Sequence, residues 1–143
     1  MTEDLRKELL WAVLPHVPFD GWSERSLKAG ASDIAMSIAT MQALVPGGGL
    51  ELIELHSTAM DDEMTCRLSE QEGGVMRIRD RITFALRIRL ELGAGEREAV
   101  RHGVAHLALP QNVLVGTRLL YRTVDAIWHA VGDAATDWNF YSK

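Results

Sequence analysis

Glycine and proline divide this chain into segments of helix length, and this division limits most strongly what the chain can fold into. The segments are rich in Leu, Ala, Arg and Glu, which favour helices, and they lack both sustained period-two alternation and an Asn-Gly hairpin turn. At 143 residues the chain is long enough to bury a core of its own. The sequence therefore predicts an all-α fold. Helices are expected at residues 2–14, 23–34, 37–44, 49–70, 75–92, 96–109 and 110–131, with an eighth near 136–141 after a stop at Gly132.

The first three predicted helices form a head with the spacing of a helix-turn-helix. Ser23 and Ser37 are good N-cap residues, and the short turn between the second and third helices begins at Ala35. The spacing matches the head of TetR-type regulators. We therefore predict a TetR-like helical bundle with a head over residues 1–46 and a helical body over residues 47–143.

The charges of this head contradict a role in reading DNA. The third predicted helix offers Gln42 and Thr40 but no Lys or Arg, whereas base edges and phosphates demand cationic and amide donors. The whole chain carries a net charge of −5, unlike the basic face of a typical nucleic-acid binder. We predict no nucleic-acid partner and a head kept for packing or protein contact, with a TetR-type transcriptional regulator as the alternative function.

Three further features bear on the cellular compartment. Cys66 is the one cysteine, which excludes an internal disulfide and fits a reducing compartment. The N-terminal residues are acidic and lack the pattern of a secretory signal, and no run of 18 apolar residues occurs. These features predict a cytoplasmic protein.

The predicted helices at 75–92 and 110–131 are apolar around most of their girth. In the second of them, Arg118, Arg122 and His129 fall with an aspartate in one narrow stripe, and almost everything else is apolar. Such a helix is either a central core helix with one solvated edge or a wall of an apolar cavity. The cavity interpretation predicts a lipid-binding site between the two helices. Its wall candidates are Leu86, Leu90, Leu114, Leu120, Val124 and Ile127.

Few polar side chains in the sequence have a spacing that is typical of a catalytic or metal-binding site. Arg89 lies in the apolar arc of the helix at 75–92, so we expect a carboxylate partner within the protein, with a lipid head group as the alternative. Glu98, His102 and His106 have a spacing that can ligate a metal, but no second helix offers matching ligands, and we predict no metal site. Nucleophile elbow, catalytic triad and dinucleotide fingerprint are absent from the sequence. We expect no catalytic residues, no cofactor and no enzymatic activity.

Three stretches carry a more specific signal: residues 14–23, residues 108–112 continuing into 123–128, and residues 132–143. In this order they resemble the ubiquinone (coenzyme Q) biosynthesis accessory family, the ninth of the coenzyme Q proteins, in a bacterial form. The resemblance covers nearly the whole chain, and the Pro-His-Val-Pro-Phe-Asp-Gly-Trp string at 15–22 is its most specific part.

This resemblance implies a TetR-like fold that binds lipid in place of DNA. The ligand would be an isoprenoid quinone or a phospholipid, and the protein would present a polyprenylated quinone precursor to the demethoxyubiquinone hydroxylase. A homodimer is also implied as an alternative to a monomer. The surface patch that docks the hydroxylase in this family would here consist of Asp137, Trp138, Asn139, Phe140 and Tyr141. The alternative for these aromatic residues is packing against the preceding helix.

The sequence departs from the family pattern at its C-terminus. The family continues with further helices, the last of them amphipathic and in contact with membrane, whereas this sequence ends at Lys143. The resemblance thus implies that those helices are missing, and that peripheral contact with the inner membrane depends on them. Phe140 also stands where the family more often has a tryptophan.

Overall fold

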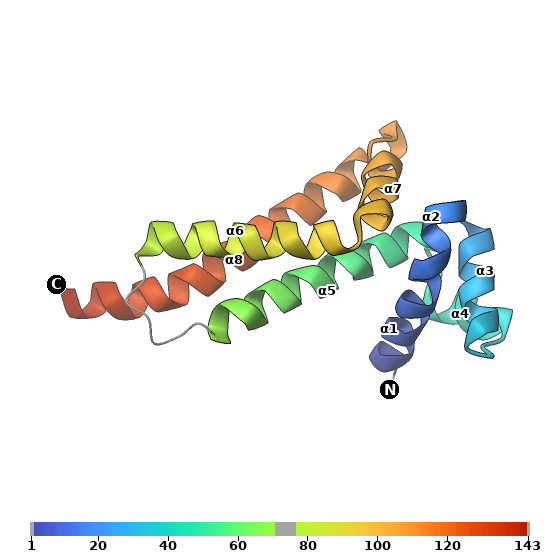
Figure 1. Cartoon of the computed structure of the whole chain (residues 1–143), viewed down its shortest axis with the longest axis horizontal. Helices are drawn as coiled ribbons and strands as arrows, with labels where there is room; N and C mark the ends of the chain where they lie inside the picture. The colour runs from blue at the N-terminus through green and yellow to red at the C-terminus, as the bar shows by residue number, and fades with distance from the viewer. Residues whose placement is uncertain (1, 71–76, 143) are drawn as a thin grey trace. The chain divides into compact units, whose positions relative to one another are not determined.

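The computed structural model describes residues 2–70 and 77–142, and it describes side chains over residues 2–70 and 77–131. Within these ranges every regular element is a helix, so the all-α prediction is confirmed (Figure 1). The elements are α1 (Thr2–Val13), the 3₁₀ turn η1 (Leu14–His16), α2 (Val17–Asp20), α3 (Glu24–Asp33), α4 (Ile38–Leu44), α5 (Gly49–Glu70), α6 (Ile78–Gly95), α7 (Arg97–Leu107), the 3₁₀ turn η2 (Pro110–Asn112) and α8 (Val113–Ser142).

The chain forms two compact units, the first made of Met1–Ser57 and Glu96–Gly116 and the second of Thr58–Gly95 and Thr117–Lys143. These units are a feature of the packing, and the functional division into a head and a lipid-binding body stays a prediction.

In the first unit α1 and α3 cross with their backbones almost touching. A Cβ atom added to Gly30 of α3 would lie 2.9 Å from the Cα of Val13 and 2.6 Å from its Cγ2. The absence of a side chain at Gly30 therefore allows this crossing. The apolar side chains beneath it are fully enclosed, among them Leu9, Leu10 and Leu27.

The caps and the turn expected in the head are confirmed. The Ser23 hydroxyl accepts from the Ser26 backbone N–H at 3.4 Å, and the Ser37 hydroxyl accepts from the Thr40 N–H at 3.1 Å. Ala35 adopts a φ of 54°, which reverses the chain between α3 and α4. The relationship to TetR regulators stays a prediction.

Trp22, from the specific string at 15–22, joins three parts of the first unit. Its indole Nε1 donates to the carbonyl oxygen of Ala99 in α7 at 3.0 Å, and its ring lies against that of His56 with the centroids 5.6 Å apart. Gly49, at the start of α5, approaches the Trp22 backbone so closely that an added Cβ would lie 2.0 Å from the carbonyl oxygen. Trp22 therefore positions α5 and α7 around its ring.

In the second unit the C-terminal half of α5, α6 and α8 enclose a common core. Figure 1 shows α6 alongside α5 and α8. The three helices bury Met64, Leu68, Ala85, Ile88, Ile127 and Val131 together.

Two helix ends differ from the sequence-based prediction. α6 continues through Gly93, where a break was expected, and ends at Gly95. α8 passes without interruption through Gly132 to Ser142, so the predicted stop and the separate eighth helix are wrong. One glycine costs a helix interior only about 1 kcal/mol, which the remaining hydrogen bonds and packing of a long helix offset. Pro110 opens a 3₁₀ turn, and the α-helix begins only at Val113.

None of the helices within residues 2–70 and 77–142 has both the length and the hydropathy needed to cross a bilayer.

Candidate functional site

A buried polar cluster in the second unit joins α5, α6 and α8. The Arg89 Nε of α6 donates to Asp61 Oδ1 of α5 at 2.8 Å. The Thr123 hydroxyl of α8 lies 2.8 Å from the same oxygen and 3.1 Å from the other oxygen of that carboxylate. The carboxylate side chain is only 3% exposed, so it depends on these partners for the solvation it lacks. The predicted carboxylate partner of Arg89 is thereby confirmed.

This cluster fixes how the helices can rotate. Burying one ion of such a pair without its partner costs about 3–5 kcal/mol. A turn of α8 about its axis would move Thr123 away from Asp61, and a turn of α6 would move Arg89 away. The cluster therefore decides which faces of α6 and α8 look into the core and which look outward.

α8 is apolar over a wider arc than its core contacts cover. The core part of this arc carries Leu119, Ile127 and Val131, which are at most 8% exposed. An adjoining part of the apolar arc is turned to the solvent. It carries Leu120 at 66% exposure, Tyr121 at 71%, Val124 at 41% and Trp128 at 60%. These four side chains fall within one arc of the helix at 100° per residue, so they form a continuous stripe.

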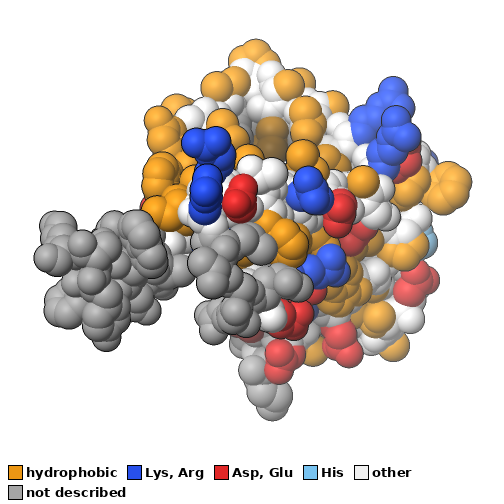
Figure 2. Space-filling view, turned by 60° about the vertical axis from the view of Figure 1, so that its left-hand side comes forward, with side chains coloured by type: hydrophobic (Ala, Val, Ile, Leu, Met, Phe, Trp, Pro, Cys, Tyr) orange, Lys and Arg blue, Asp and Glu red, His pale blue; other side chains and the backbone are white. Residues whose placement is uncertain are grey.

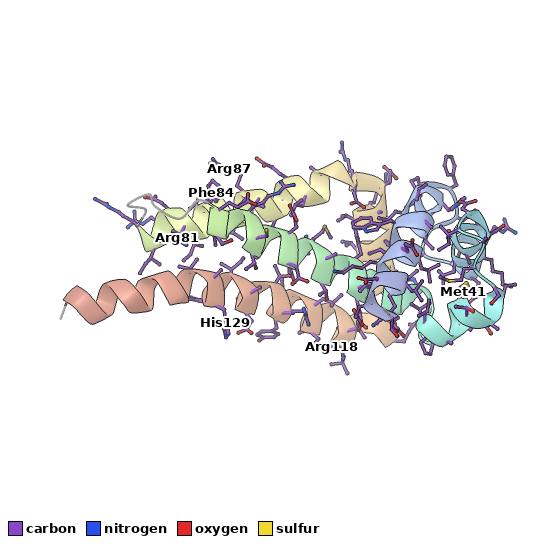
Figure 3. All side chains as sticks on the ribbon, turned by 90° about the horizontal axis from the view of Figure 1, so that it is seen from below. Met41, Arg81, Phe84, Arg87, Arg118 and His129 are labelled. Atoms are coloured by element: carbon purple, nitrogen blue, oxygen red, sulfur yellow. The ribbon has the colours of Figure 1, made fainter. Side chains whose placement is uncertain are left out.

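A polar edge borders this stripe. Figure 3 shows Arg118 and His129 on the same edge of α8, as the sequence predicted. His129 is held there by its Nδ1, which lies 2.9 Å from the backbone oxygen of Asp125. The solvent-facing part of α8 is thus half polar and half apolar.

The outer face of α6 is also apolar. Leu86 and Leu90 are 47% and 73% exposed, and they lie one helical turn apart. They line an open hollow of about 500 Å³ together with Thr83, Arg87, Glu91 and Ala94. All of these lining residues belong to α6, so the hollow is a shallow surface feature with charged groups on one side. In Figure 2 hydrophobic side chains cover much of the visible described surface, interrupted by groups of Lys and Arg.

The structure places the predicted wall residues in three settings. Leu86 and Leu90 share the outer face of α6, and Leu120 and Val124 share the exposed stripe of α8. Ile127 lies in the core of the second unit at 8% exposure. Leu114 belongs to the first unit and is 84% exposed. Their role in binding lipid stays a prediction.

The predicted docking patch lies in the C-terminal part of α8. The backbone of Asp137, Trp138, Asn139, Phe140 and Tyr141 belongs to α8, and their side chains lie outside the described residues.

Sequence reasoning did not select two exposed aromatic residues. Tyr121 and Trp128 are spaced seven apart, the i, i+7 repeat of one helix face. That spacing was a usable signal, but the sequence alone did not say whether the face was turned to the core or to the solvent.

The candidate metal ligands of α7 are loosely arranged. His102 Nε2 lies 4.0 Å from Glu98 Oε2. Across the part of the chain with described side chains, no three His, Cys, Asp or Glu residues are grouped so that they could hold a metal ion.

The amino-acid sequence of this chain is similar to those of proteins from one family. The COQ9 family model matches residues 113–143, which is α8 and the residue after it. The "Ubiquinone biosynthesis protein COQ9, mitochondrial" of Xenopus tropicalis is 30% identical over 148 residues, covering 99% of this chain. The Homo sapiens protein of that name is 28% identical over 149 residues. The "Probable ubiquinone biosynthesis protein coq9, mitochondrial" of Dictyostelium discoideum is 22% identical over 146 residues. This chain spans 46–48% of the length of these three relatives.

Proposed function

The chain belongs to the COQ9 family, and on that premise we propose that it serves ubiquinone biosynthesis as a non-catalytic lipid-binding protein. It binds an isoprenoid quinone precursor on the apolar surface of α6 and α8 and presents this precursor to the demethoxyubiquinone hydroxylase.

The observation that carries this proposal is the exposed apolar stripe of α8. A helix that packs into a core buries its apolar side chains, but α8 leaves the four members of this stripe 41–71% exposed. Large exposed apolar patches mark sites of interaction. The family model matches this same helix, so the stripe lies in the segment by which the family is recognised.

An isoprenoid tail suits such a stripe because the tail is long, narrow and apolar. Each CH₂ group that leaves water contributes about 0.8 kcal/mol. A tail lying along Leu120, Val124 and Trp128 would therefore gain affinity with each isoprene unit it places against them. We place the quinone oxygens at the polar edge, where Arg122 is exposed.

The test is to identify the lipid that the protein carries. We expect organic extraction of the purified chain, followed by mass spectrometry, to yield an isoprenoid quinone or its precursor. The double variant Leu120→Gln/Val124→Gln should carry at least about tenfold less, since two apolar contacts with the tail are replaced by polar ones. The matched control is Ile38→Gln, at a half-exposed apolar side chain of α4, which should carry as much as the wild type. Absence of isoprenoid lipid from the purified chain would overturn the proposal.

Presentation to the hydroxylase is tested separately. Buried aromatic side chains dominate many protein interfaces. We expect Trp138→Ala and Phe140→Ala to weaken capture of purified hydroxylase by at least about tenfold, with the bound lipid retained. Trp11→Ala, at a half-exposed tryptophan of α1, is the control and should leave capture unchanged. Unchanged capture by both C-terminal variants would exclude this docking patch.

A further inference from the structure

The turn between α7 and α8 is apolar, exposed and free of acidic residues. Val104, Leu109, Val113 and Leu114 are 61%, 41%, 50% and 84% exposed. All four belong to the first unit. We call residues 104–114 the α7–α8 tip.

The charge around the tip is unusual for this chain. From residue 99 through residue 124 there is no Asp or Glu, although the chain has 20 acidic residues and a net charge of −5. It is the longest such stretch in the sequence. Arg97 and Arg101 are exposed on α7 just before the tip, where Arg101 lies 3.9 Å from Glu98, an acidic neighbour outside the stretch. The tip itself therefore has no carboxylate to repel an anionic surface, and it has cations beside it.

Three backbone N–H groups in the turn of the tip make hydrogen bonds within the protein. The N–H groups of Ala108, Leu109 and Asn112 donate to the carbonyls of Val104, His106 and Leu109 at 2.9, 3.3 and 2.8 Å. The Asn112 side-chain Nδ2 donates to the His106 carbonyl at 2.9 Å, and Pro110 has no N–H to satisfy. Because these groups are already paired, moving the tip out of water would not leave them without partners.

We propose that the α7–α8 tip inserts into the interfacial region of a bilayer that contains anionic phospholipid. The exposed side chains enter the boundary between head groups and acyl chains, and Arg97 and Arg101 lie at the level of the phosphates. This contact goes beyond the proposed lipid carriage and does not depend on it.

The experiment measures binding of the intact chain to vesicles by co-sedimentation. Vesicles of phosphatidylcholine mixed with phosphatidylglycerol should bind the protein, and vesicles of phosphatidylcholine alone should bind it more weakly. Leu109→Gln/Val113→Gln should lose at least about tenfold of the binding, since two inserted apolar side chains become polar. Phe19→Gln, at an 85% exposed side chain of α2, is the matched control and should bind like the wild type. Leu114 is left unchanged because it is also a candidate lipid-wall residue.

A second measurement locates the contact. Val113→Cys in a Cys66→Ser background is labelled with an environment-sensitive fluorophore, and a blue shift is expected on addition of the mixed vesicles. The same label at Phe19→Cys should stay in water. Each of three results would overturn the proposal. The wild type could fail to bind mixed vesicles, the double glutamine variant could bind as well as the wild type, or the label at residue 113 could remain in water. Lipid extracted from Leu109→Gln/Val113→Gln should match that of the wild type, so this test and the test of lipid carriage can fail independently.

Discussion

Two regions of the molecule differ in where their apolar side chains lie: the crossing of α1 with α3 encloses them, whereas α6 and α8 leave many of them exposed. At the crossing, the backbones approach so closely that Gly30 has no room for a Cβ, and the apolar side chains beneath it are enclosed. In the second unit, α6 and α8 bury part of their apolar surface and leave the rest in contact with water, where Leu90 at 73% and Tyr121 at 71% are the most exposed apolar side chains.

The difference indicates which region is shaped by stability alone. At the α1–α3 crossing the apolar side chains are closely packed against one another and stabilise the fold, as in the interior of any stable domain. The exposed apolar side chains of α6 and α8 lie outside the core of the second unit, so the stability of that core does not explain why they are apolar. Binding of an apolar ligand or partner is the explanation we favour.

The largest effect is expected where the second unit is held together. Asp61→Leu should lower the free energy of unfolding by about 3 kcal/mol, because it removes the buried carboxylate shared by Thr123 and by Arg89, whose side chain is only 18% exposed. Urea unfolding followed by circular dichroism measures this loss. The double variant Asp61→Leu/Arg89→Met should recover most of it, and a double variant as unstable as the single one would show that the ion pair is not the cause.

A somewhat smaller loss is expected at the α1–α3 crossing. Gly30→Ala should cost about 2–3 kcal/mol, since the new methyl group meets the backbone of Val13, which cannot move aside. Gly95→Ala is the control: a Cβ there meets nothing within 4 Å, so stability should stay equal or rise by up to about 1 kcal/mol. Equal stability of Gly30→Ala and the wild type would mean that the crossing is looser than described.

The capping serine of α4 should contribute less. Ser37→Ala removes the acceptor for the Thr40 N–H and should cost about 1 kcal/mol. Ser37→Asp keeps an acceptor at this position and should retain the stability of the wild type. A thermal-unfolding midpoint that is the same for Ser37→Ala and Ser37→Asp would argue against the cap.

The smallest effect on stability is expected on the outer face of α6. Leu86→Gln/Leu90→Gln should change the free energy of unfolding by no more than about 0.5 kcal/mol, as for most exposed positions. A loss of 2 kcal/mol or more, about the value of a buried leucine, would mean that this face is part of the core after all. The comparison between the two regions would then fail.

Local signals in the sequence predicted much of the fold. Ser23 and Ser37 marked helix starts, Ala35 marked the turn, and the apolar arc around Arg89 predicted its acidic partner. Gly93 and Gly132 misled, because each lies inside a long helix whose other hydrogen bonds and packing offset the cost of one glycine.

The site was harder to predict than the fold, and Val124 and Ile127 show why. Both were candidate wall residues, yet the first is 41% exposed and the second lies in the core. Periodicity indicates that α8 is apolar on more than one side, but the face that turns inward is set by the contact of Thr123 with Asp61. That contact joins residues far apart in the sequence, which no local pattern reveals.

The Asp61 carboxylate has a consequence for how such proteins can diverge. One acidic group serves an arginine from α6 and a hydroxyl from α8, so none of the three positions can mutate freely while the others remain. Over evolutionary time the three should change together or not at all, and a lineage that loses the acid should be found to have replaced the arginine as well.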